Sequence, residues 1–329
     1  MTGRRVVIAL GGNALLDRTM ADTAEAMRAS ARVAAEVIAE IAALGWEVVI
    51  THGNGPQVGR ILLQNEMAKD VTAPMPLDVC GAESQGQIGL LLVTAIHDVL
   101  ARSGQQRPVV NILTLTRVRQ DDPAFSHPTK PIGPYYDEAE ARVLARDRGY
   151  HMTPAGPDKA GWRRTVASPR PWAIQEAEQI VQLVASGAIV VACGGGGVPV
   201  VQTQSGLTGV EAVIDKDLAA CILAQAVDAQ ALLILTDVDA VYSGFGTPQQ
   251  KRLAHISAGE ARTLLAQGDL GAGSMGPKVD AATSFAEATG FPAYIAQLTD
   301  GARALSQQAG TAVVPDHHPA FSGRVAESA

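Results

Sequence analysis

Three observations predict an α/β protein built around an open, mainly parallel sheet. Short apolar runs typical of buried strands alternate with segments of helical periodicity along most of the chain. Aromatic residues make up only 4% of the 329 residues, while small and aliphatic residues dominate, which favours helices packed on parallel strands over a β-sandwich. Three of the apolar runs lead directly into glycine-rich turns, which is where such sheets bind ligands.

Apolar periodicity and turn residues predict the individual strands and helices along the chain. Before residue 121 the pattern predicts strands at 6–10, 47–51 and 109–113 and helices at 24–44 and 85–103. After residue 171 it predicts strands at 189–193, 231–236 and 292–296 and helices at 176–186, 216–226, 257–267 and 278–289. The longest apolar stretch, near 88–100, contains His97 and Asp98 and is too short to span a bilayer, so we expect no membrane association.

Residues 121–171 interrupt this alternation. The segment holds eight prolines and a dense mixture of charges, and its only helical periodicity lies at 137–148. We predict an inserted subdomain or lid, because loops this long are uncommon in compact domains unless they are functional. A solvated connector is the alternative.

Composition excludes several classes of function. A net charge of -7 without a long basic stripe argues against nucleic-acid binding. Cys80, Cys193 and Cys221 form no CxxC pair, and their odd number fits buried thiols in a reducing compartment, so a cytoplasmic protein is expected. The seven histidines do not cluster and no GxSxG or HExxH motif occurs, so neither a protein-held metal nor acyl transfer is predicted.

The glycine-rich turns indicate phosphate chemistry. They contain Gly11, Gly12 and Asn13 in the first case, Gly53, Asn54 and Gly55 in the second, and Gly194 to Gly197 in the third. Glycine permits positive φ and leaves backbone N–H groups open to an anion. Neither HGNGPQVG nor GAGSMGPK matches a Rossmann or P-loop fingerprint, because the first has GxGxxxG spacing and the second has Pro277 in place of the lysine.

Two lysines stand at predicted helix starts. Lys278 follows a Gly-Ser-Met-Gly-Pro turn, and Lys216 lies between Asp215 and Asp217. The helix dipole favours acids there, so capping explains one or both aspartates, but it opposes a lysine unless an anion is bound. Ordinary surface charge is the alternative for Lys216.

Two further segments are candidate site elements. Lys130 stands between Pro128 and Pro131, which would hold the lysine at a lid tip; a rigid loop without a role is the alternative. The sequence LTDVDAVY at 235–242 follows a strand and would frame a base or ribose, or Asp237 merely caps the next turn.

Taken together, the motifs resemble carbamate kinase of the amino-acid kinase superfamily over residues 5 to about 315. They are ALGGNALL, THGNGPQVG, MPLDVC with SQGQIG, HPTKPIGP, GWRR with SPRP, CGGGGVPVV, GVEAVIDKD and GSMGPK. The PTKPIGP insert is not expected in kinases of acetylglutamate, aspartate or UMP, which share the core fold. The resemblance implies a three-layer αβα amino-acid kinase fold with an open, mainly parallel sheet and a small protruding subdomain.

The resemblance also implies a reaction. ATP and carbamate would give ADP and carbamoyl phosphate, reversibly and with Mg²⁺, run toward ATP in arginine, allantoin or agmatine breakdown. Carbamate is already an anionic oxygen nucleophile, so alignment and charge neutralisation suffice without a general base.

Roles carry over from the resemblance residue by residue. The catalytic set is Lys130, Lys216, Asp217 and Lys278, with Asp217 holding the lysines in place. The carbamate-binding set is Gly11, Gly12, Asn13, Gly53 and Asn54. The nucleotide-binding set is Gly194, Gly195, Lys216, Asp237, Val238, Tyr242, Met275 and Lys278.

The implied organisation is a single domain over 1–329. Residues 1–120 and 172–205 would form a carbamate-binding lobe, 121–171 the lid, 206–315 a nucleotide-binding lobe and 316–329 a polar tail. A homodimer is expected, with 80–100 as its surface or, alternatively, as core.

Two other functions stay open. One is a kinase of the same fold with another small carboxylate or phosphate acceptor, although the compact glycine pocket leaves little room for a larger acid. The other is a nucleotide- or metabolite-sensing module without catalysis.

Overall fold

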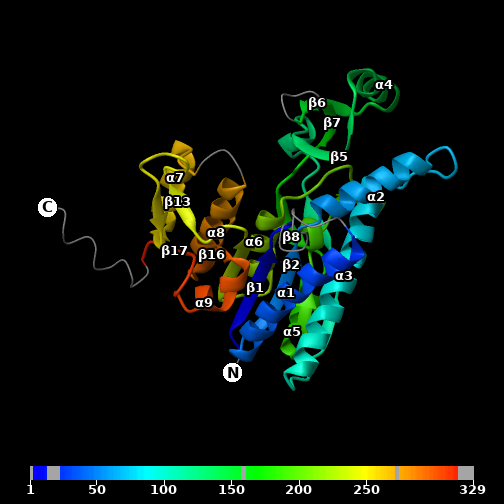
Figure 1. Cartoon of the computed structure of the whole chain (residues 1–329). Helices are drawn as coiled ribbons and strands as arrows, with labels where there is room; N and C mark the ends of the chain where they lie inside the picture. Colours follow the sequence, from blue (N-terminus) through cyan, green and yellow to red (C-terminus); the bar gives the residue numbers. More distant parts are fainter. Residues whose placement is uncertain (1–2, 13–22, 157–160, 271–273, 318–329) are drawn as a thin grey trace.

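The computed structural model describes residues 3–12, 23–156, 161–270 and 274–317, so Asn13 and most of the predicted tail lie outside the described residues. The largest sheet has eight strands in the order β15-β17-β16-β12-β1-β2-β9-β3. Its strands are β1 Arg5–Leu10, β2 Glu47–His52, β3 Val109–Asn111, β9 Ile189–Val191, β12 Ala231–Thr236, β15 His255–Ser257, β16 Ala293–Gln297 and β17 Thr311–Val314. Figure 1 shows its strands β1, β2 and β16 in the middle of the molecule. The β16–β17 pairing is antiparallel and the others are parallel, which confirms the predicted fold class.

Helices cover both faces of this sheet and give three layers. One face carries α1 (Ala24–Ala43), α3 (Leu77–Arg102) and α9 (Gly301–Leu305), and the other carries α5 (Ala177–Ala185), α6 (Lys216–Ala226) and α8 (Met275–Thr289). In β1, Val6 and Ile8 pack in the core formed with α1, α3 and α9, whereas Val7 and Ala9 pack in the core formed with α5, α6 and α8. Because both faces are buried, the strand appears in the sequence as one continuous apolar run.

Smaller sheets flank the centre. A four-stranded sheet has the order β11-β10-β4-β8, and β13 pairs with β14. The remaining bounds are β4 Leu115–Val118, β8 Pro171–Ile174, β10 Val198–Thr203, β11 Gly206–Gly209, β13 Val241–Ser243, β14 Lys251–Leu253, α2 Gly55–Ala68 and α7 Ala258–Gln267.

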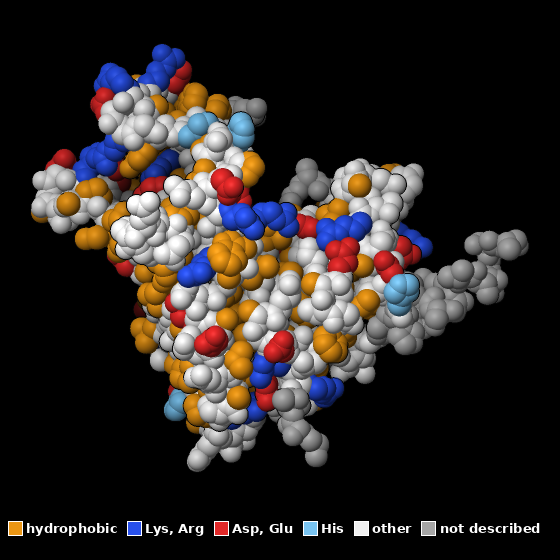
Figure 2. Space-filling model, turned by 180° about the vertical axis from the view of Figure 1, so that it is seen from behind, with side chains coloured by type: hydrophobic (Ala, Val, Ile, Leu, Met, Phe, Trp, Pro, Cys, Tyr) orange, Lys and Arg blue, Asp and Glu red, His pale blue; other side chains and the backbone are white. Residues whose placement is uncertain are grey.

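The inserted segment forms a projecting subdomain. Its sheet has the order β5-β7-β6, with β5 Lys130–Tyr136, β6 His151–Ala155 and β7 Gly161–Val166, next to α4 Glu138–Arg148. Figure 1 shows it standing away from the main body, and Figure 2 shows a hollow between it and the C-terminal part. The helix predicted at 137–148 is α4, which Asp137 begins with a capping box to Glu140.

One prediction about this subdomain is wrong. Lys130 does not lie at the tip, because it begins β5 at the end that joins the body. Its pairing partner Val166 directly precedes Ala167, which bridges to Ala212. Lys130 therefore lies beside the core of the molecule.

Among the described helices, α3 alone is long and apolar enough to cross a membrane, with a mean hydropathy of 1.2. Its Ile88, Leu92 and Ile96 are at most 1% exposed and belong to the core shared with α1 and the sheet. That packing is typical of a core helix.

Substitution of Phe285 in α8 tests the packing of the core between α8 and the sheet directly. The Phe285 ring is fully buried, so Phe285→Ala should leave a cavity and lower the free energy of unfolding by about 3–5 kcal/mol in urea denaturation. The control Phe291→Ala, where the ring is 41% exposed, should change it by less than about 0.5 kcal/mol. Equal losses for the two variants would contradict the described packing.

Candidate active site

Two lysines from different helices meet at one buried carboxylate. Lys216 and Asp217 begin α6, and Lys278 lies near the start of α8. Asp217 Oδ1 is 2.7 Å from Lys216 Nζ, and Asp217 Oδ2 accepts a 3.0 Å hydrogen bond from Lys278 Nζ. Asp217 is 4% exposed and Lys278 is 7% exposed. The packing of α6 against α8 thus assembles a charge cluster from residues 61 positions apart in sequence.

The cluster carries an excess of positive charge. Burial by itself raises the pKa of the Asp217 carboxyl, but the nearby ammonium groups of Lys216 and Lys278 outweigh it and hold the pKa below its usual value. One carboxylate thus faces two ammonium groups. Lys216 Nζ is buried and, apart from its ion pair with Asp217, has no partner among the described residues, so the remaining donors of its ammonium group are unsatisfied. Because such a group is costly to bury, the cluster is suited to accept an anion.

Asp215 and Lys130 stand at the edge of this cluster. Asp215 is the N-cap of α6, and its Oδ1 accepts a 2.9 Å hydrogen bond from the Asp217 backbone N–H. Its Oδ2 accepts a 3.2 Å hydrogen bond from Lys130 Nζ. The Lys130 side chain is 45% exposed, so this ion pair adds little stability and is readily exchanged. Asp215 therefore caps the helix, whereas Asp217 orders two lysines.

The glycine-rich turns meet at the carboxyl edge of the sheet because β1, β2 and β9 are neighbours there. A Cβ on Gly53 would lie 3.2 Å from the Gly12 backbone nitrogen. Gly195 has a φ of 66°, and the Asn54 amide fills the space that a Cβ would need. The Asn54 amide also donates a 2.8 Å hydrogen bond to Ser84 Oγ of α3. The described residues of the three turns thus lie close to one another, as the sequence predicts.

A cavity of about 220 Å³ is lined by the second and third glycine turns, by Lys216 and Asp217 of the charge cluster, and by the inserted subdomain, whereas Gly11, Gly12 and Lys278 do not line it. Its lining includes Gly53, Asn54, Gly55, Lys130, Gly133, Arg163, Gly195, Asp215, Lys216 and Asp217. Within the described ranges no three His, Cys, Asp or Glu side chains gather as metal ligands, and Asp217 is engaged by lysines.

The residues predicted for nucleotide binding lie in three places. Gly194 and Gly195 are in the turn after β9, Asp237, Val238 and Tyr242 follow or belong to the segment after β12, and Met275 begins α8. Met275 shares its helix with Lys278, and the Tyr242 hydroxyl donates a 2.9 Å hydrogen bond to Asp239. Their contact with a nucleotide stays a prediction.

Sequence reasoning missed three residues of this site, namely His52, Ser84 and Arg163. His52 ends β2 fully buried, and a Cβ on Gly194 would lie 2.5 Å from its ring. Burial, with a smaller contribution from the Lys216 charge, lowers the pKa of His52 to about 4, although its Nδ1 hydrogen bond to the Gly53 carbonyl opposes this. The signal was a polar side chain at the end of an otherwise apolar strand.

An ordered pair of buried lysines at the carboxyl edge of a parallel sheet is suited to bind an anionic group, and the glycine turns are suited to phosphate. The chain belongs to the amino acid kinase family, whose model matches residues 4–297.

Individual relatives narrow the similarity further. Carbamate kinase from Pyrococcus furiosus is 47% identical over 315 residues, covering 95% of this chain and 100% of the relative. Carbamate kinase from Pyrococcus horikoshii is 48% identical over 314 residues, covering 94% and 99%. The solved structure of carbamate kinase from Giardia lamblia bound to AMP-PNP superposes with a TM-score of 0.91 at 40% identity, covering 96% and 99%. The resemblance predicted from the motifs is confirmed.

Because folding lowers the pKa of His52, we expect the protein to lose stability in acid. This pKa falls from an ordinary 6.5 to about 4 on folding, so below pH 6.5 the unfolded chain binds a proton that the folded protein excludes. This contribution to stability is therefore lost as the pH falls from 6.5 toward 4. Between pH 7.5 and pH 5, urea denaturation should show the wild type losing about 2 kcal/mol more than His52→Gln. Equal losses in both proteins would show that His52 is not the group responsible.

Proposed function

We propose that this protein is a carbamate kinase, which interconverts ATP and carbamate with ADP and carbamoyl phosphate. The observation that carries the proposal is the lysine cluster at Asp217, which presents the buried Lys216 ammonium beside the glycine turns. The names of the relatives support the choice of carbamate, and the Giardia lamblia structure bound to AMP-PNP supports an adenine nucleotide.

In this reaction the phosphoryl group passes directly between the two substrates, so the protein forms no covalent bond to it. A carbamate oxygen forms a bond to the γ-phosphorus while the bond from that phosphorus to the β,γ-bridging oxygen breaks, and the electron pair stays on ADP. No proton has to move, so no general base is needed. The protein has to align the two oxygens and neutralise charge on the transferring group.

The lysines supply that neutralisation. Lys216 and Lys278 contact the phosphate oxygens, and Asp217 acts as the positioning residue that fixes both ammonium groups. Lys130 adds a third ammonium from the inserted subdomain by exchanging its exposed pairing with Asp215 for the substrate. Donors held in place before the reaction stabilise the transition state without a reorganisation cost.

The substrates divide between the two lobes. Carbamate is held by the turns with Gly11, Gly12, Asn13, Gly53 and Asn54 in the lobe of 1–120 and 172–205. The nucleotide is held in the lobe of 206–315 by Asp237, Val238, Tyr242 and Met275, with Gly194 and Gly195 at the junction. Mg²⁺ bound together with the nucleotide would supply further neutralisation of the phosphate charge.

Cellular context and assembly complete the proposal. Three buried free thiols support a cytoplasmic location, and a role in arginine catabolism with flux toward ATP follows from the family resemblance. A homodimer through the outer face of α3 is supported by Leu90, which is 59% exposed on a helix whose opposite face is core.

Activity measurements test the proposed function. With ADP, Mg²⁺ and carbamoyl phosphate the protein should form ATP, read through hexokinase and glucose-6-phosphate dehydrogenase. Lys216→Ala and Lys278→Ala should each lower turnover on the order of a hundredfold, because each removes a preorganised donor. Lys69, an exposed lysine at the C-cap of α2, provides the matched control, and Lys69→Ala should keep normal turnover. Inactive but folded wild type, or near-normal rates in both site variants, would refute the proposal.

A further inference from the structure

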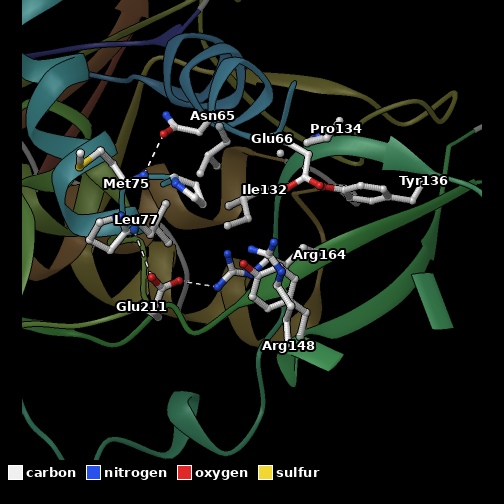
Figure 3. Close-up of a pocket in the computed structure, with 15 residues that line it drawn as sticks. Asn65, Glu66, Met75, Leu77, Ile132, Pro134, Tyr136, Arg148, Arg164 and Glu211 are labelled. Carbon is white, nitrogen blue, oxygen red and sulfur yellow. Dashed lines mark hydrogen bonds and ion pairs between the residues drawn. The ribbon is translucent and has the colours of Figure 1, made fainter. Parts of the chain in front are cut away.

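Two successive arginines of β7 have opposite surroundings. Because neighbouring strand residues point to opposite faces, Arg163 and Arg164 line different cavities. Arg164 pairs with Glu211, and its guanidinium carbon lies 3.7 Å from the Tyr150 ring centroid. Figure 3 shows Arg164 and Glu211 directed at each other in the second cavity, of about 230 Å³. The charge of Arg164 is therefore already compensated by the protein.

Arg163 lines the active-site cavity with a different set of contacts. Its Nη2 donates a 2.9 Å hydrogen bond to the Gly133 carbonyl, and its guanidinium carbon lies 5.2 Å from the Tyr135 ring centroid. In the described part of the chain it makes no ion pair, and its buried Nε has no hydrogen-bond partner. The Gly133 carbonyl thus holds the Arg163 guanidinium through Nη2, while no described carboxylate compensates its positive charge.

The Gly133 contact fixes the arginine close to Lys130. Gly133 has a φ of 68°, and the pairing of β5 with β7 is interrupted between Ile132 and Tyr136. Arg163 binds the carbonyl in this interruption, three residues after Lys130 on the same strand. Both cations therefore come from the same end of the subdomain, and both line the cavity that Lys216 also lines.

We propose that Arg163 is a further substrate-binding residue, whose guanidinium binds the phosphate oxygens of carbamoyl phosphate beside Lys130. The inference rests on the proposed function. A guanidinium presents several N–H donors in a fixed plane and binds phosphate through more than one of them. An anion would satisfy the buried Nε and compensate the charge, which the described protein groups do not do. ADP, bound through the other lobe, does not need this contact.

Kinetics of Arg163→Met and Arg163→Lys test the role. Arg163→Met should raise the KM for carbamoyl phosphate about tenfold or more and leave the KM for ADP unchanged, because a charged hydrogen bond to one substrate is lost. Arg163→Lys should fall between it and the wild type, and added guanidinium ion should partly restore Arg163→Met. Arg142→Met, which removes an exposed arginine of the same subdomain, is the control and should behave as wild type.

A structural role alone gives a different result. If Arg163 only holds Gly133, Arg163→Met lowers the thermal unfolding midpoint while the KM for carbamoyl phosphate stays normal, and that outcome overturns the inference. Calorimetric titration with inorganic phosphate needs no turnover, so it separates this inference from the proposed function. Weaker phosphate binding by Arg163→Met supports the role even if no ATP forms, and unchanged affinity contradicts it.

Discussion

The site depends on the contact of one buried carboxylate with two lysines. The Asp217 carboxylate lets Lys216 occupy the first turn of α6, where the helix dipole opposes a cation, and lets Lys278 lie buried at the start of α8. Removing one partner from such a buried pair typically costs 3–5 kcal/mol, about the strength of a well-packed core contact. The same contact ties α6 to α8, so the cation pair and the packing of that layer form a single unit.

The sheet order supplies the rest of the geometry. Because β12, β1, β2 and β9 are neighbours, their carboxyl ends bring the glycine turns together beside the start of α6. The inserted subdomain adds two cations to the cavity lining, because Lys130 pairs with Asp215 and Arg163 donates a hydrogen bond to the Gly133 carbonyl. Positive charge in the cavity thus comes from the main body and from the inserted subdomain.

Much of this was predictable from sequence, for physical reasons. Buried parallel strands and long amphipathic helices leave strong periodic signals, and β12 and α6 lie where the periodicity placed them. The strands of the inserted subdomain show no periodic hydrophobic signal in the sequence, because short, half-exposed strands such as β5 contain prolines and charged residues among their apolar ones. The local pattern alone left Asp215 and Asp217 interchangeable, since both fit a helix start. The family resemblance assigned Asp217 to the lysines, and the hydrogen bonds of the two aspartates distinguish them in the structure. The roles of His52 and Arg163 depend on contacts with distant residues, which no local pattern contains.

The central claim is that Asp217 organises the lysines for phosphoryl transfer. The most direct measurement is the turnover of Asp217→Asn in ATP formation from ADP, Mg²⁺ and carbamoyl phosphate, beside Asp98→Asn, where the carboxylate is 70% exposed. The account predicts a folded Asp217→Asn protein with turnover reduced on the order of a hundredfold, because the ammonium groups lose the anion that positions them. Turnover equal to that of Asp98→Asn would contradict it.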